Sequence, residues 1–155
     1  MMIYDKATEK DILSLVELRL AYLREDYGEL SDEQVSMITD QLHRYYPEHL
    51  NKDLFVYICR DDDQIISCCF LCVSEKPANP SFISGKTGTV LNVYTKPEYR
   101  RKGIAGKCLT MLLEEAKALG LDYVELKATE DGYHLYKSLG FQDDISHYHQ
   151  MKYDI

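Results

Sequence analysis

The chain of 155 residues is long enough for one domain with a buried core, and we expect residues 1–155 to form a single unit. Apolar residues make up 45% and charged residues 28%, a balance that excludes an intrinsically disordered chain. The net charge of −8 argues against nucleic-acid binding, and without a long apolar run or signal peptide we expect a cytoplasmic protein with no membrane contact.

Two helix-capping patterns organise the first half of the sequence. Thr8 and Asp11 have the spacing of a capping box before an apolar-periodic segment, and Ser31 and Gln34 repeat that spacing before a second one. Runs rich in β-branched and aromatic residues follow, joined by three aspartates. The elements predicted here are a strand at Ile3-Tyr4, a helix ending at Tyr27-Gly28, a helix ending before Pro47, and a hairpin of Leu54–Arg60 with Gln64–Ser74.

The second half begins with a loop, because Lys76–Lys86 contains two prolines and a glycine. The elements predicted after it are a strand at Val90–Thr95, a helix at about Gly103–Leu119, a strand at Asp122–Lys127, a helix at about Gly132–Leu139, and one or two strands within Phe141–Ile155. This order of strands and helices, without a linker or repeat, predicts a mixed α/β (α+β) fold.

The stretch VLNVYTKPEYRRKGIAG, from Val90 to Gly106, carries the most functional information. A strand stops before Pro97, and the basic turn Arg100-Arg101-Lys102 leads through Gly103 into an amphipathic helix. The first amides of a helix lack intrahelical partners, and the helix dipole adds partial positive charge there. Together with the nearby cations, this arrangement favours binding of a pyrophosphate.

This turn resembles the acyl-CoA-binding motif of the GNAT superfamily of N-acetyltransferases. Arg100, Gly103 and Ala105 match the fixed positions of its pattern Gln/Arg-x-x-Gly-x-Gly/Ala. Downstream, Leu135–Phe141 resembles the GNAT signature Leu-Tyr-x-x-Leu-Gly-Phe. The resemblance implies a central mixed, mostly antiparallel sheet flanked by helices, acetyl-CoA as co-substrate, and transfer of its acetyl group to a primary amine by direct attack in a ternary complex.

By the same resemblance, Tyr136 is the general acid that protonates the CoA thiolate. The strand before the turn pairs with the pantetheine amides, and the turn holds the diphosphate. The implied CoA-binding residues are Val93, Tyr94, Thr95, Arg100, Arg101, Lys102, Gly103, Ile104, Ala105 and Gly106.

The general base is less clearly marked. Many GNAT enzymes use a glutamate on the strand that contacts CoA, but Thr87–Thr95 contains no acid and only Asn92. Glu125, on the following strand, is the nearest substitute. Glu130 and Asp131 are alternatives that also suit the start of the short helix, and a water chain or a backbone carbonyl remains open as well.

The resemblance implies that acceptor contacts come from the first two helices, their connection and the later loops, with the aromatic and acidic tail as a further candidate. Tyr22, Glu25, Asp26 and Tyr27 would form an anionic, aromatic rim suited to an ammonium group, or simply a solvated helix end. The resemblance implies a small-molecule or peptide amine acceptor, no metal, and is compatible with a homodimer. The alternative function is a non-catalytic acyl-CoA sensor or regulatory domain that has kept the CoA site without a base.

Overall fold

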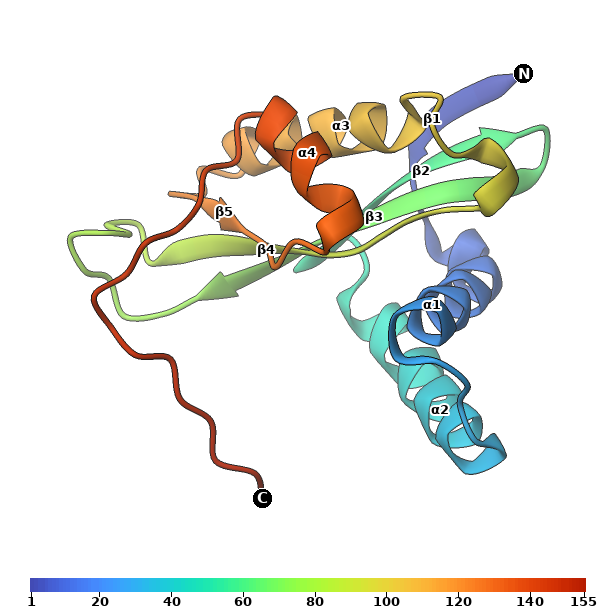
Figure 1. The fold of residues 1–155 in the computed structure, drawn as a ribbon, viewed down its shortest axis with the longest axis horizontal. Helices are drawn as coiled ribbons and strands as arrows, with labels where there is room; N and C mark the ends of the chain where they lie inside the picture. Colours follow the sequence, from blue (N-terminus) through green and yellow to red (C-terminus); the bar gives the residue numbers. More distant parts are fainter.

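A computed structural model describes residues 1–155 and shows one sheet with helices on both faces (Figure 1). In chain order the elements are β1 (Met2–Lys6), the 3-10 turn η1 (Glu9–Asp11), α1 (Ile12–Tyr27), α2 (Asp32–His49), β2 (Leu54–Asp61), β3 (Gln64–Glu75), β4 (Lys86–Thr95), the 3-10 turn η2 (Pro97–Tyr99), α3 (Ile104–Ala118), β5 (Val124–Glu125) and α4 (Glu130–Ser138). The strands lie in the order β1-β2-β3-β4-β5. Only the β4–β5 pair is parallel, which confirms the expected mixed, mostly antiparallel sheet.

The predicted capping boxes both form. Ser31 Oγ accepts from the amide of Gln34 at 3.1 Å, and Gln34 Oε1 accepts from the amide of Ser31 at 2.9 Å. Asp11 Oδ2 accepts from the amide of Thr8 at 2.9 Å. This box lies at the start of η1, which leads into α1. The predicted end of the second helix before Pro47 is wrong, because α2 continues to His49. Proline in the last turn removes only one hydrogen bond there, and the chain stays helical.

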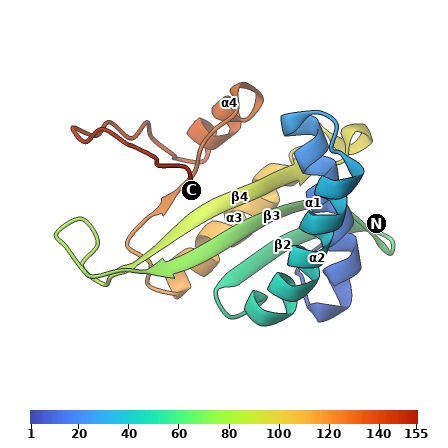
Figure 2. The same cartoon turned by 90° about the horizontal axis from the view of Figure 1, so that it is seen from below.

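The helices divide into two layers. Helices α1 and α2 cover one face of the sheet, and α3 covers the other (Figures 1 and 2). The α1–α2 side contains a core cluster with Leu15, Val56 and Phe70, whereas the α3 side contains one with Leu71 and Leu109. Consecutive strand residues alternate between these clusters, as the pleat of a strand requires.

Strand β4 carries an irregularity near its middle. Its register against β3 shifts between Cys68 and Phe70, and Asn92 has a left-handed φ of 52°. Asparagine tolerates this conformation better than most residues, and here the buried Asn92 amide also donates to Cys68 Sγ at 3.4 Å. The bulge bends the strand as it approaches α3.

The edge of β4 that faces β5 is mostly open. Strand β5 pairs only with Gly88 and Thr89, so residues 90–95 of β4 have no strand partner on that side. We call this open edge of β4, residues 90–95 with their free backbone groups, the slot.

Two predictions for the last part of the chain are wrong. The strand expected at Asp122–Lys127 shortens to Val124–Glu125, and no strand forms within Phe141–Ile155. The final segment extends away from the body, with Ile145 94% and Met151 89% exposed (Figure 1). A strand as short as β5 offers too few backbone groups on its outer edge to hold another strand in register.

No helix has both the length and the apolar character needed to cross a membrane.

Candidate functional site

The turn between β4 and α3 presents a run of free amides. Helix α3 begins at Ile104, and its N-cap Gly103 has a φ of 77°, which glycine adopts without steric cost. Arg101 is also left-handed, with a φ of 63°. The backbone amides of residues 101–106 donate to no protein acceptor, and the first helical bond is from Lys107 N to Gly103 O at 3.3 Å. A Cβ at Gly103 would meet no atom within 4 Å, so the space in front of these amides is open.

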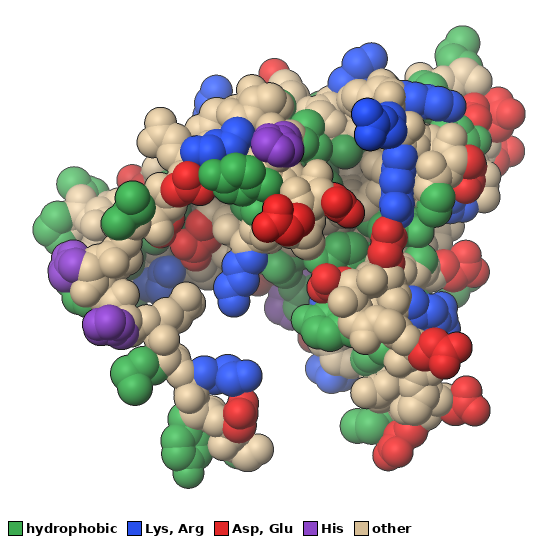
Figure 3. Space-filling model, viewed as in Figure 1, with side chains coloured by type: hydrophobic (Ala, Val, Ile, Leu, Met, Phe, Trp, Pro, Cys, Tyr) green, Lys and Arg blue, Asp and Glu red, His purple; other side chains and the backbone are tan.

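Cations surround this open turn. The Arg101 side chain is exposed and makes no ion pair, while Lys102 Nζ lies 5.5 Å from the centre of the Tyr99 ring. One turn into α3, Lys107 Nζ lies 5.2 Å from the Tyr4 ring. Figure 3 shows Lys and Arg side chains gathered over this end of α3. Free amides, a helix N-terminus and nearby cations together suit a diphosphate.

Arg100, by contrast, is held by the protein. Its guanidinium donates to both Glu25 carboxylate oxygens at 2.7 Å, and its Nε donates to Thr95 O at 2.7 Å. The group also lies 5.5 Å from the Tyr94 ring. The hydrogen bond from Arg100 lowers the pKa of Glu25. Arg100 therefore links the turn to α1, and its side chain is not free to reach a ligand.

The other predicted CoA contacts on β4 lie along its open edge. Val93, Tyr94 and Thr95 follow the bulge at Asn92, where β4 has no β5 partner. On the opposite edge, Ser67 Oγ donates to Tyr94 O at 3.1 Å and lies 2.8 Å from Thr95 Oγ1. The end of β4 is thus fixed against β3 and open toward the slot.

Tyr136 lies on α4 in a half-buried position. Its ring packs edge-to-face against Phe141, with centroids 5.9 Å apart, and no protein group accepts from its hydroxyl. Burial raises the pKa of Tyr136 to about 12, with smaller effects from Tyr22 and Cys69. The phenol therefore remains protonated at neutral pH and is available as a donor.

Glu125 is exposed on β5 and lies opposite Thr89. Its neighbours Val124 and Leu126 pack into the core cluster beneath α3. Since side chains alternate along a strand, Glu125 faces the side of the sheet that α1 and α2 cover. The carboxylate makes no ion pair within the protein.

The alternative acids, Glu130 and Asp131, lie in the first turn of α4. The N-cap of this helix is Thr129, whose Oγ1 accepts from the amide of Gly132 at 3.2 Å. Both carboxylates complement the helix dipole there, which is a sufficient structural reason for their presence.

The expected acceptor rim is only partly anionic. Glu25 is neutralised by Arg100, whereas Asp26 and Tyr27 are exposed, with Tyr27 at 76%. Tyr22 is half-buried and lies near enough to Tyr136 to raise its pKa. Among the predicted rim residues, Tyr22 is therefore the one that interacts electrostatically with Tyr136.

Sequence reasoning missed two residues next to this slot, Asn92 as a structural element and Arg19. Arg19 Nη1 donates to Asn92 Oδ1 at 3.2 Å. The signals were present in the sequence: an asparagine interrupts a β-branched run, and an arginine stands one helical turn from Leu15 and from Leu23 on the apolar side of α1.

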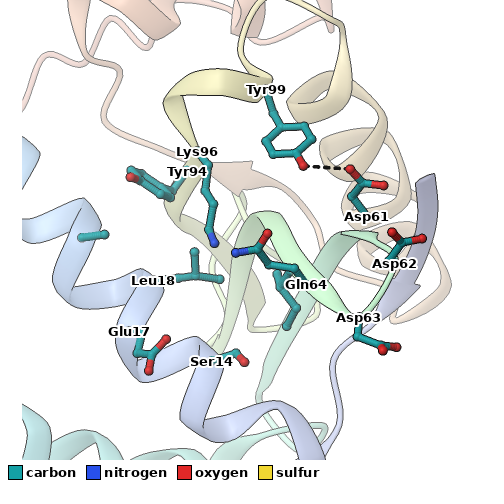
Figure 4. Close-up of a pocket in the computed structure, with 12 residues that line it drawn as sticks. Ser14, Glu17, Leu18, Asp61, Asp62, Asp63, Gln64, Tyr94, Lys96 and Tyr99 are labelled. Carbon is teal, nitrogen blue, oxygen red and sulfur yellow. Dashed lines mark hydrogen bonds between the residues drawn. The ribbon is translucent and has the colours of Figure 1, made fainter. Parts of the chain in front are cut away.

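A cavity of about 720 Å³ lies between α1, the β2–β3 turn and the end of β4. Figure 4 shows Asp61, Asp62 and Asp63 on one side and Lys96 reaching across it, with Tyr99 Oη donating to Asp61 at 2.7 Å. Its acidic walls disfavour a diphosphate. The slot along β4 is therefore a different part of the surface, although Tyr94 borders both.

Comparison with known proteins agrees with this geometry. The sequence pattern that describes the Acetyltransferase (GNAT) family matches residues 13–141. A search of curated proteins gave no significant match.

Solved structures extend the similarity to nearly the whole chain. A predicted acetyltransferase from Clostridium acetobutylicum, crystallised with acetyl-CoA, is 33% identical, with a TM-score of 0.85 over 98% of this chain and 96% of that one. A GCN5-related N-acetyltransferase from Ralstonia eutropha is 23% identical, with a TM-score of 0.81 over 97% and 99% of the two chains. A possible acetyltransferase from Clostridium difficile is 14% identical, with a TM-score of 0.78 over 100% and 98%.

Proposed function

The chain belongs to the acetyltransferase (GNAT) family and is an acetyl-CoA-dependent acyltransferase; we propose that it transfers the acetyl group to a primary amine. The observation that carries this proposal is the run of unpartnered amides at residues 101–106 beside an open strand edge. Such a site fits a long ligand with a diphosphate at one end and amide groups along its length.

The chain's own residues suit that ligand. Amides of Gly103, Ile104, Ala105 and Gly106 would hold the diphosphate, with Arg101 and Lys102 adding charge. The backbone of residues 93–95 would pair with the pantetheine amides as an added strand does. Acetyl-CoA supplies the thioester, and the protein supplies position and electrostatic support.

The acceptor amine attacks the thioester carbonyl directly in this proposal. A backbone N–H at Val93 or Tyr94 would stabilise the negative charge that develops on the carbonyl oxygen. Tyr136 would act as the general acid by donating a hydrogen bond from its hydroxyl to the departing sulfur. Orientation of the two substrates supplies about 7–11 kcal/mol of the acceleration.

Removal of the ammonium proton needs a base. An amine with a pKa of about 10.4 is almost fully protonated at neutral pH, at a cost of about 4.6 kcal/mol for the neutral form. We assign this role to Glu125, directly or through water, because it is unpaired and faces the α1–α2 side of the sheet. Glu130 and Asp131 have a structural role at the start of α4 instead.

Release of CoA thiol tests the proposed function. The protein is incubated with acetyl-CoA and a panel of amines, and binding of acetyl-CoA is measured separately by calorimetry. Amine-dependent thiol release, with one N-acetylated product per thiol, is the expected result. Tight binding without release for any amine would refute amine acetylation and favour the acyl-CoA sensor.

A further inference from the structure

Arg19 is a half-buried cation on a helix face that is otherwise apolar. It lies on α1 between Leu15 and Leu23, both buried, and turns toward the sheet, where it donates to Asn92. Helix positions of this kind usually hold leucine or valine. Placing a guanidinium there has a desolvation cost that needs a compensating partner.

The protein provides no such partner. Arg60, the other half-buried arginine, donates to Asp11 at 2.7 Å, whereas no carboxylate lies within 4 Å of Arg19. The single hydrogen bond of Arg19 goes to the neutral amide of Asn92. A guanidinium has several N–H donors in a planar fork, so most of the Arg19 donors are unused.

Arg19 lies beside one tyrosine ring, and its charge affects two more tyrosines. The Arg19 guanidinium lies 5.8 Å from the centre of the Tyr22 ring, and its charge also lowers the pKa values of Tyr45 and Tyr46 against the effect of burial. The Tyr46 hydroxyl is buried and has no hydrogen-bond partner. The unused donors of the half-buried Arg19 are therefore the groups that can bind an anionic partner.

The charged residues near Arg19 favour an anion with a single negative charge. Arg19 is the one cation whose charge acts on Tyr22 and Tyr45, and the carboxylates that act on these two side chains are Asp26 and Asp53. A planar monoanion matches one guanidinium fork, while a dianionic phosphate would face repulsion from both aspartates. These groups therefore favour a carboxylate.

This group lies next to the reaction slot. Tyr22 links the two regions, because its ring centre lies 5.8 Å from the Arg19 guanidinium and its charge raises the pKa of Tyr136. Asn92, bonded to Arg19, begins the bulge before Val93. Figure 3 shows an open space between α1–α2 and the final segment.

We propose that Arg19 binds the carboxylate of the acceptor, so that the natural substrate is a small amine that also carries a carboxylate group, such as an amino acid. This inference rests on the proposed amine acetylation and specifies its substrate class. It places the anionic end of the acceptor on Arg19, beside the Tyr22 ring, and the amine toward the thioester.

Matched acceptors test the assignment. Initial rates of CoA release are measured for amino acids and their carboxamides, for glucosamine and its 6-phosphate, and for spermidine. We expect kcat/KM for carboxylates to exceed that for carboxamides by at least about tenfold, the effect of one charged hydrogen bond. Amidation lowers the pKa of the amine and favours its neutral form, so the comparison is biased against the proposal.

Two variants identify the residue responsible. Arg19→Gln keeps a donor for Asn92 and is expected to abolish the preference for carboxylates, while acetyl-CoA affinity and thermal stability change little. Arg24→Gln, an exposed arginine on the same helix, removes the same charge and is expected to leave the preference intact. Binding of N-acetylated amino acids and their amides to the CoA-bound protein, measured by calorimetry, repeats the comparison without turnover.

The outcomes separate the two proposals. Turnover of spermidine, carboxamides or the sugar phosphate in preference to carboxylates, or a preference that survives Arg19→Gln, overturns the Arg19 assignment and leaves amine acetylation standing. Absence of both turnover and carboxylate-dependent product binding overturns both.

Discussion

Replacement of Tyr136 by phenylalanine tests the chemistry with little disturbance of the fold. The Tyr136 hydroxyl has no protein acceptor, and its ring contact with Phe141 does not involve the oxygen. Removal of this oxygen therefore breaks no hydrogen bond in the free protein. We expect the free energy of unfolding to change by less than about 1 kcal/mol.

The pKa sets the size of the catalytic effect. Full proton transfer from a phenol with a pKa of about 12 to the thiolate of a thiol with an ordinary pKa of about 8.5 is uphill by about 5 kcal/mol. Tyr136 therefore donates a hydrogen bond to the sulfur, which becomes negatively charged while the C–S bond breaks. Such a bond is worth about 1.5–3 kcal/mol, so Tyr136→Phe should lower kcat by about 10- to 200-fold.

The assay follows thiol release at saturating acetyl-CoA and amine, with acetyl-CoA affinity measured in parallel. Tyr133→Phe is the matched control, because Tyr133 lies on the same helix and donates to Asp143 at 2.9 Å on the surface. The protonated phenol is the active form and its pKa is raised, so Tyr136 should cause no loss of rate as the pH rises to about 10. An unchanged kcat in Tyr136→Phe would remove this residue from the mechanism.

Three further perturbations address the turn, the bulge and the ion pair. Gly103→Glu should weaken CoA binding at least about tenfold in calorimetry, through charge repulsion and through strain at a φ of 77°; equal affinity would refute the diphosphate assignment. Asn92→Gly should lower the free energy of unfolding, measured in urea, by about 1–3 kcal/mol, because hydrogen bonds are lost. Asn92→Ala should lower it by about 1 kcal/mol more, because alanine is strained at a φ of 52°. A more stable alanine variant than glycine variant would contradict a strained bulge. Since Arg100 lowers the pKa of Glu25, their bond stabilises the fold above the unfolded pKa of about 4.3 and loses this effect as the pH falls through the lower folded value. Both side chains are well exposed, so Glu25→Gln should cost less than about 1 kcal/mol at pH 7, and a stability gap between the two proteins that widens toward pH 3 would be inconsistent with this account.

Local signals made much of the fold predictable. Ser31 with Gln34 defines a helix start because the bonds that form the capping box lie within four consecutive residues. The same holds for Gly103, whose conformation and exposed amides belong to the turn itself. The site that we propose for the diphosphate is therefore predicted from a few consecutive residues.

Other features depend on contacts that a linear pattern does not contain. Arg100 meets Glu25 across 75 positions, so the turn alone gave no sign that this guanidinium is engaged. Strand β5 is short because β4 pairs with it only at Gly88 and Thr89. A strand of this length offers the final segment too little edge to pair with. Pro47 shows a third kind of limit, because a helix tolerates proline when the lost bond lies in its last turn.

The net charge of −8 and the local charge at the acceptor side lead to different expectations about the substrate. A negative surface acts over long range and keeps the protein soluble, but it selects no particular ligand. Selection depends on groups that lose water on binding and find no partner inside the protein. Glu25 is already neutralised by Arg100, whereas Arg19 is half-buried and unpaired. The half-buried guanidinium, rather than the acidic exterior, therefore decides which amine is held long enough to react.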